Sequence, residues 1–282
     1  MANLRVIRKR IRTVASTRKI TKAMKMVAAA QFRRFEDRVR QATPYAQKLD
    51  ELLLDLRRSV RTAVHPLLEE RPVQKRALVV FTSDRGLCGA FNANVLRQLE
   101  REMTENPATI LVPAGRKGIG YVTRRNYPLL RSVNDLWGKY TFEKAAALAD
   151  ELVQGFVEKK YDRIDLLFSE FRSVISQRPK KMTLAPIAAQ QSDGESVLPP
   201  IYEPNREEIL KALVPRAIRI RFYVAGLNSL ASEFGARMTA MDSATRNAGE
   251  MIDKLTLDMN RARQATITKE LMEIIAGAEA LK

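Results

Sequence analysis

The chain has 282 residues, 45% hydrophobic and 6% aromatic, so it can bury more than one compact core and does not have the composition of a disordered chain. Lys and Arg outnumber Asp and Glu by 49 to 32, a formal net charge of +17. A single cysteine, Cys88, excludes an internal disulfide, and a single histidine, His65, leaves little for histidine-based metal sites or general bases. No run of uncharged apolar residues is long enough to predict a membrane-spanning helix.

The positive charge is concentrated at the N-terminal end. Residues 1–35 contain eleven Lys and Arg and no acid, and Glu36 is the first carboxylate. A helix that only faces solvent usually mixes charges, because opposite charges four residues apart stabilise it. The segment therefore predicts an anionic partner, and composition leaves nucleic acid, anionic lipid and acidic protein loops all open.

The N-terminal segment has the pattern of one long helix. From Leu4 to Leu56, steps of alternately three and four residues meet mostly apolar side chains, which is a heptad seam. Its positions include Ile7, Ile11 and Val14. Pro44 lies inside the pattern and is expected to kink or loosen the helix.

Three consecutive seam positions of this helix are polar instead of apolar. They are Arg18, Thr21 and Lys25. Because a helix buries its apolar stripe, we expect the buried face to move at this point to the nearest apolar side chains. These are Ile20, Met24 and Val27.

A second long seam occupies the C-terminal end, where we expect a helix over residues 217–282. Its positions include Phe234, Met241, Ile252, Leu255 and Met259. A repeat of 3.5 residues keeps a stripe straight only when two helices wind around each other, so the two ends predict an antiparallel coiled coil. The tip over residues 274–281 is small or apolar on nearly every side, which predicts that protein surrounds it.

The middle of the chain alternates short apolar runs with helical stretches, which indicates an α/β domain with a mostly parallel, Rossmann-like sheet. The expected strands are residues 77–81, 110–112, 164–168 and 182–187, with a weak one at 129–133, and the expected helices are residues 91–103, 117–125 and 142–157. Residues 190–200 read as a linker. The expected organisation is thus 1–65 for the first coiled-coil helix, 70–200 for the α/β domain and 205–282 for the second helix.

Two glycine-containing loops are candidates for chemical sites. Residues 83–89 follow a strand, but they lack the ending of a phosphate-binding loop, so a tight turn is the better interpretation. Residues 115–120 have the wrong glycine order for a dinucleotide fingerprint. His65 is expected on the surface, and the carboxylates mostly lie beside Lys or Arg. The sequence therefore predicts no catalytic centre, no metal site and no cofactor.

Four blocks of the sequence resemble the γ subunits of F-type ATP synthases, in matching order and spacing over the whole chain. They are TRKITKAMKMVAA at residues 17–29, SDRGLCGAFN at 83–92, ARMTAMDSATRNA at 236–248 and NRARQATITKEL at 260–271. The resemblance implies a non-catalytic rotor shaft inside a hexameric ring of α and β subunits. Rotation of the shaft would set the three catalytic sites to different conformations and couple them to ion flow through the membrane ring.

The resemblance also implies roles for individual residues. Contacts to β-subunit loops are expected at Arg263, Gln264, Thr268, Met24, Lys22 and Lys25. The apical bearing would hold Leu271, Ile274, Ile275 and Leu281. The foot that meets the membrane c-ring and the ε subunit would include Tyr202, Glu203 and Pro204.

The resemblance and the N-terminal segment also bear on regulation and location. Chloroplast members carry a regulatory cysteine pair, and the single Cys88 excludes that form of redox control. Without a visible presequence, we expect a bacterial protein, peripheral on the cytoplasmic face of the plasma (inner) membrane. The alternative function is a basic coiled-coil protein that binds nucleic acid, which the N-terminal charge alone supports.

Overall fold

The structure is a computed structural model that describes residues 4–59, 65–134, 136–173, 176–187 and 205–279. It divides into two compact units. Residues 1–28 and 238–282 form the first, here called the helical unit, and residues 29–237 form the second, here called the core unit. The helices α1 (Leu4–Ser59) and α5 (Arg206–Glu279) each contribute a segment to both units.

The bounds of α1 match the prediction closely, and the helix continues through Pro44 without interruption. The helix α5 begins at Arg206, one residue after the start of the expected second helix (205–282), and passes through Pro215, whereas the apolar seam from residue 217 does not mark this start. Its start is instead fixed by Asn205, whose side-chain oxygen accepts a 2.9 Å hydrogen bond from the Glu208 amide. Such a cap satisfies an amide that the first helical turn leaves unpaired.

Within each unit, α1 and α5 run antiparallel, as the two seams predicted. In the helical unit, Lys25 pairs with Asp242, and the Thr21 hydroxyl contacts that of Thr245, further along α5. In the core unit, the Arg221 guanidinium donates to Asp50 at 2.7 Å, and the rings of Phe35 and Phe234 stack. In both units, the residue number of the partner on α5 increases as the residue number on α1 decreases, so the two helices run antiparallel.

The α/β part of the core unit is built on a four-stranded sheet in the order β2-β1-β3-β4. The strands are β1 (Arg76–Phe81), β2 (Thr109–Ala114), β3 (Arg163–Phe171) and β4 (Gln177–Ala185). β1 pairs in parallel with β2 and β3, whereas β4 is antiparallel to β3, so the sheet is mostly parallel as expected. β4 starts five residues before the expected position 182. Residues 129–133 add only isolated bridges to β2.

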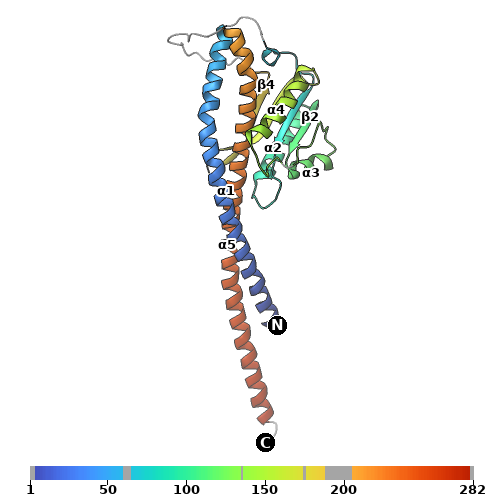
Figure 1. The fold of residues 1–282 in the computed structure, drawn as a ribbon. Coiled ribbons are helices and arrows are strands. Elements are labelled where there is room, and N and C mark those ends of the chain that lie inside the picture. Colours follow the sequence, from blue (N-terminus) through green and yellow to red (C-terminus); the bar gives the residue numbers. More distant parts are fainter. Residues whose placement is uncertain (1–3, 60–64, 135, 174–175, 188–204, 280–282) are drawn as a thin grey trace. The chain divides into compact units, whose positions relative to one another are not determined.

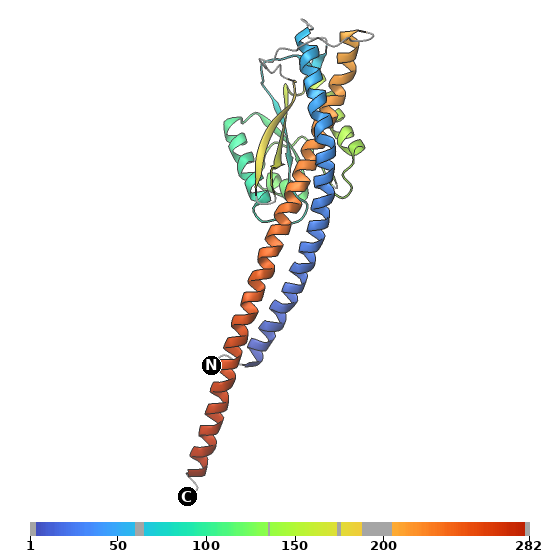
Figure 2. The ribbon, with the colours of Figure 1, turned by 90° about the vertical axis from the view of Figure 1, so that its left-hand side faces the viewer.

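The sheet is covered on both faces, which explains why β1 is apolar at every position after Arg76. Ala77, Val79 and Phe81 face one core with α4 (Phe142–Val157), α1 and α5. Leu78 and Val80 face the second core, with α2 (Phe91–Glu105) and α3 (Arg116–Arg124). Figures 1 and 2 show the core-unit parts of α1 and α5 side by side, with the sheet next to them.

Candidate functional site

The loop at residues 83–89 is a structural turn, as predicted. Cys88 is buried, and burial, the largest cause, raises the pKa of its thiol, so it remains protonated. Leu87 and Gly89 adopt positive φ angles of 64° and 56°. The Arg237 guanidinium donates to the carbonyl oxygens of Arg85 and Gly86, and these hydrogen bonds hold the turn against α5.

The second glycine-containing segment serves close packing. Gly115 has a φ of 102°, and a Cβ at this position would lie 2.2 Å from the Thr82 carbonyl oxygen. A Cβ at Gly118 would lie 2.7 Å from the Thr82 hydroxyl, to which the Gly118 amide donates. These glycines therefore bring the start of α3 against the end of β1.

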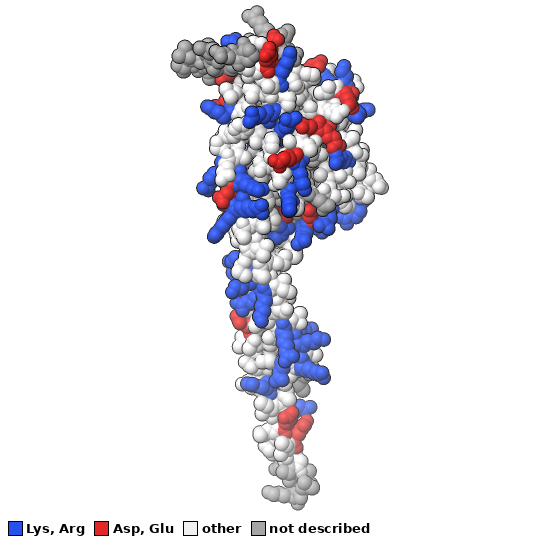
Figure 3. All heavy atoms as spheres, viewed as in Figure 1, with Lys and Arg blue, Asp and Glu red and all other residues white. Residues whose placement is uncertain are grey.

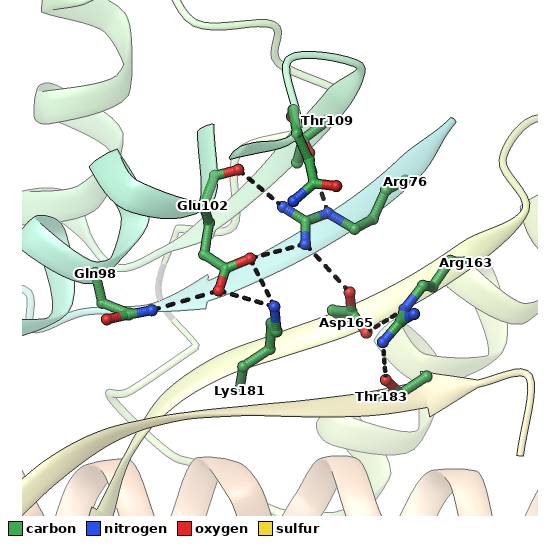
Figure 4. A network of polar contacts seen from close by, with 9 residues as sticks. Arg76, Gln98, Glu102, Thr109, Arg163, Asp165, Lys181 and Thr183 are labelled. Carbon is green, nitrogen blue, oxygen red and sulfur yellow. Dashed lines mark hydrogen bonds and ion pairs between the residues drawn. The ribbon is translucent and has the colours of Figure 1, made fainter. Parts of the chain in front are cut away.

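The most buried polar cluster of the core unit joins α2 to three strands (Figure 4). The Arg76 guanidinium donates to Glu102 at 2.8 Å and lies 3.5 Å from Asp165. Lys181 also donates to Glu102, and Arg163 donates to Asp165. Burial opposes ionisation of Glu102, but the hydrogen bonds from Lys181 and Arg76 outweigh it and lower its pKa. A carboxylate held ionised in this way is a structural partner rather than a proton donor.

The surface position expected for His65 is wrong, because the side chain is half-buried. Its Nδ1 accepts a 3.2 Å hydrogen bond from the Leu67 amide and caps a 3-10 helix, Pro66–Leu68. Burial, followed by the positive charge of Lys211, lowers its pKa, so it stays neutral near pH 7. Among the residues described, His, Cys, Asp and Glu form no group that could hold a metal ion.

The predicted seam lies between α1 and α5. In the helical unit, Ile7 and Met241 are buried. Ile11, Val14, Ile252, Leu255 and Met259 are half-buried, as is Phe234 in the core unit. Val14 and Leu255 line one groove together with Val6 and Met251. The heptad pattern thus identified the contact face of both helices.

The expected shift of the buried face at the polar seam positions is wrong. Ile20 and Val27 are 57% and 62% exposed, and Met24 is half-buried, whereas Thr21 is buried. The seam stays in register because α5 offers a polar partner to Thr21 and to Lys25. The Thr21 and Thr245 hydroxyls lie 2.8 Å apart.

The two other polar positions meet α5 in different ways. Lys25 donates to Asp242 at 2.5 Å, and this hydrogen bond is the largest cause of a lowered Asp242 pKa. Arg18 lies over Gly249, where a Cβ would be 3.7 Å from the guanidinium carbon. Polar layers of this kind fix the register of a coiled coil more strictly than apolar ones.

The residues expected to contact partner subunits are largely accessible. Lys22, Arg263, Gln264 and Thr268 are exposed, whereas Met24 and Lys25 are half-buried. At the C-terminal tip, Leu271, Ile274 and Ile275 are 55%, 71% and 49% exposed. Leu281, Tyr202, Glu203 and Pro204 lie outside the described residues.

Sequence reasoning missed further exposed apolar side chains of the helical unit. Besides Ile20 and Val27, they include Met26, Leu257, Ile267 and Met272. The signal was present for Met26, Leu257 and Met272, because they fall outside the three-and-four steps of the seam, whereas Ile267 lies on the continuation of the seam and is nevertheless exposed. An apolar side chain that the partner helix does not cover points to a further protein surface.

The charge of the helical unit is as uneven as that of the sequence. Residues 1–28 contain nine Lys and Arg and no acid. Arg8, Lys9, Arg10 and Arg12 are all exposed. Figure 3 shows groups of Lys and Arg along this unit on the face drawn there. The exposed surface of the helical unit therefore combines cationic side chains with apolar ones. None of the described helices is long and apolar enough to cross a membrane.

Comparison with known proteins places these surfaces in a class. A sequence model of the family described as ATP synthase matches residues 3–281. Two bacterial relatives, the ATP synthase gamma chains of Geobacter metallireducens and Desulforamulus reducens, are 48% and 46% identical, each over 100% of both chains.

Solved structures agree with this assignment. A chain of the central stalk and c-ring structure of the Tetrahymena thermophila mitochondrial ATP synthase has a TM-score of 0.61 at 30% identity, over 80% of this chain and 99% of that chain. A chain of the Euglena gracilis mitochondrial ATP synthase has a TM-score of 0.72 at 19% identity, over 99% of this chain and 94% of that chain, which supports the fold.

The family match, together with the two antiparallel terminal helices and the inserted α/β domain, therefore places the chain among the subunits of the ATP synthase class. Within that class, it belongs to the ATP synthase gamma chain family. As such it is a non-catalytic component of the central stalk of an F-type ATP synthase.

Proposed function

We propose that the chain is the rotor within a hexameric ring of α and β subunits and turns as ions flow through a membrane c-ring. The observation that carries this proposal is the exposed apolar and cationic surface of the helical unit. A protein that exposes so many apolar side chains over one element normally covers them with another protein. A ring that encloses the helices would provide that cover without requiring one fixed register.

The cationic surface is assigned to acidic loops of the β subunits rather than to nucleic acid. Exposed apolar side chains, Ile20 and Val27, interrupt the cations on α1, and phosphate backbones offer no apolar partner for them. Complementary charge at a protein interface mainly guides association and orientation. A contact that moves during rotation requires complementary charge of this kind rather than a tightly bound interface in one fixed geometry.

The proposed individual contacts also divide into polar and apolar ones. Arg263, Gln264, Thr268 and Lys22 are exposed and available for hydrogen bonds to β-subunit loops. Met24 would add a half-buried apolar contact, and Lys25 would act while tied to Asp242. Leu271, Ile274, Ile275 and Leu281 would sit in an apolar bearing at the end of the ring.

The base of the rotor is assigned to the foot. Tyr202, Glu203 and Pro204, which precede α5 in sequence, would meet the c-ring and the ε subunit. Residues 1–65 and 205–282 then form the shaft, and residues 70–200 form the α/β base. The assembled complex would hold the chain peripherally at the cytoplasmic face of a bacterial plasma membrane.

A pull-down with purified α and β subunits tests the cationic surface. Replacing Arg8, Arg10 and Arg12 by Gln should weaken capture and flatten its salt dependence, because three cations are removed from one surface. The matched control replaces the exposed Arg97, Arg101 and Lys144 of the α/β domain. Unchanged capture of α and β, together with tight DNA binding that the triple variant loses, would favour the nucleic-acid alternative.

Removing the bearing residues provides a second test. Deletion of residues 273–282 should weaken assembly or torque, while circular dichroism of the α/β domain stays unchanged, because the described tip contributes no buried side chain. Loss of the α/β signal would show that the tip stabilises the fold instead.

A further inference from the structure

One turn of α5 in the core unit contacts both the α/β domain and α1. Arg219 donates to Asp150 of α4 at 2.7 Å. Two residues later, Arg221 donates to Asp50 of α1, also at 2.7 Å. These pairs point in opposite directions from the same turn, so this part of α5 is held both to the α/β domain and to the other long helix.

Aromatic rings fill the space around this turn, although aromatic residues are only 6% of the chain. The cluster consists of Phe81, Trp137, Tyr140, Phe142, Phe222 and Tyr223, linked by ring contacts of 5.4 to 5.6 Å. It joins β1, the residues before α4 and the first residue of α4 to two consecutive residues of α5. Large rings of this kind contribute both buried area and a defined geometry.

Tyr140 makes ring contacts with Trp137 and Tyr223 and, among the described residues of the cluster, is the member with hydrogen bonds to both long helices. Its hydroxyl lies 3.2 Å from the carbonyl oxygens of Phe222 and Tyr223, and can donate to either. Its own carbonyl oxygen accepts a 3.1 Å hydrogen bond from Arg38 of α1. A Cβ at Gly226 would lie 2.1 Å from the Tyr140 hydroxyl, so the contact needs glycine on α5.

We propose that Tyr140 is a coupling residue that clamps the α/β domain to both long helices, so that these parts of the core unit turn as one body. The inference rests on the proposed rotor function and deepens it. Torque that enters at the base reaches the helices only if the domain does not rotate or slide against them. Tyr140 opposes this movement because its hydroxyl bonds to α5 and its carbonyl oxygen bonds to α1.

The chain contains a matched control for this clamp. Tyr161 is equally buried, donates to the Leu152 carbonyl at 2.6 Å, and faces Gly155, where a Cβ would lie 2.4 Å from its hydroxyl. All of these residues belong to the α/β domain, and the hydrogen bond of the Tyr161 hydroxyl joins two parts of that domain. Tyr140→Phe and Tyr161→Phe therefore each remove one buried hydrogen bond, but only the first belongs to the clamp.

The test compares the two variants in the assembled complex in membrane vesicles, with ATP hydrolysis and a membrane-potential dye recorded together. Loss of one buried hydrogen bond shifts a local opening equilibrium by about fivefold. We expect amide exchange over residues 219–226 to quicken by about that factor in Tyr140→Phe. The potential generated per ATP hydrolysed should fall in this variant and stay at the wild-type value in Tyr161→Phe.

The pair Gly226→Ala and Gly155→Ala repeats the comparison with a steric change in place of a lost bond. Equal potential per ATP in Tyr140→Phe and Tyr161→Phe would overturn the clamp. A wild-type complex that hydrolyses ATP without generating any potential would instead overturn the rotor function, so the two failures are distinguishable.

Discussion

The core unit and the helical unit use the same two helices in opposite ways. In the core unit, α1 and α5 bury large side chains such as Leu56 and Phe222 against an α/β domain. In the helical unit the seam narrows to a few buried residues, and apolar side chains such as Ile20 and Ile274 face outward. The core unit buries such side chains within itself, whereas the helical unit exposes apolar side chains that need another protein to cover them.

The contrast shows where stability and function are separated in this chain. Substitutions in the core unit should change the free energy of unfolding, because its side chains have no alternative partner. Substitutions on the exposed face of the helical unit should change assembly and leave folding nearly unaffected.

The largest effect is expected from breaking the buried polar cluster of the core unit. Arg76→Ala leaves Glu102 and Asp165 without their shared guanidinium, and removing one partner of a buried ion pair costs about 3–5 kcal/mol. Denaturant unfolding monitored on the α/β domain measures the loss. A change below about 1 kcal/mol would mean that water replaces the guanidinium at no great cost.

A pair of alanine substitutions tests the comparison directly. Leu166→Ala removes a fully buried side chain of the sheet and should destabilise the chain by about 2–5 kcal/mol. Ile274→Ala removes an exposed side chain and should change stability by less than about 0.5 kcal/mol. Ile274→Ala should nevertheless weaken assembly. Equal destabilisation by both variants would remove the distinction between the units.

Acid should weaken the core unit through Glu102. Its pKa is lowered in the folded chain, so its ion pairs stabilise fully above the ordinary value of 4.5 and are lost as pH falls through the folded value. Unfolding of wild type and Glu102→Gln from pH 7 to pH 3 measures this contribution. The variant should lose less stability over the acid range than wild type, and parallel losses would show that other groups dominate.

The smallest effect concerns the polar seam of the helical unit. Lys25→Met removes the hydrogen bond that lowers the Asp242 pKa, so this pKa should rise toward its ordinary value of 3.8. Nuclear magnetic resonance titration of the Asp242 carboxyl detects the shift. Lys22→Met is the matched control, because Lys22 is exposed on the same helix. An equal shift in both variants would show a general charge effect instead of a specific pair.

The sequence predicted the periodic features of this fold well. The seam through Ile7 and Met241, the antiparallel pairing and the mostly parallel sheet follow from spacing alone. The apolar seam alone does not mark the start of α5, because that start depends on the cap at Asn205 and the helix passes through Pro215. Periodicity reports which residues are apolar, and it does not report which polar residues will find a partner.

The candidate site was predicted less completely for the same reason. The outward position of Ile20 and Val27 depends on Thr21 and Lys25 meeting Thr245 and Asp242, more than two hundred residues away. The clamp at Tyr140 depends on tertiary contacts that no local pattern encodes. Roles assigned to Arg263 and Gln264 came from resemblance to a family, and the structure adds that both are exposed.

Rotation of a single assembled complex tests the central claim most directly. A bead can be attached through Arg124→Cys, an exposed position on α3, because the native Cys88 is buried and does not compete for the label. With the α and β subunits fixed to a surface and ATP supplied, we expect the bead to turn continuously in one direction. ATP hydrolysis with a stationary bead would contradict it.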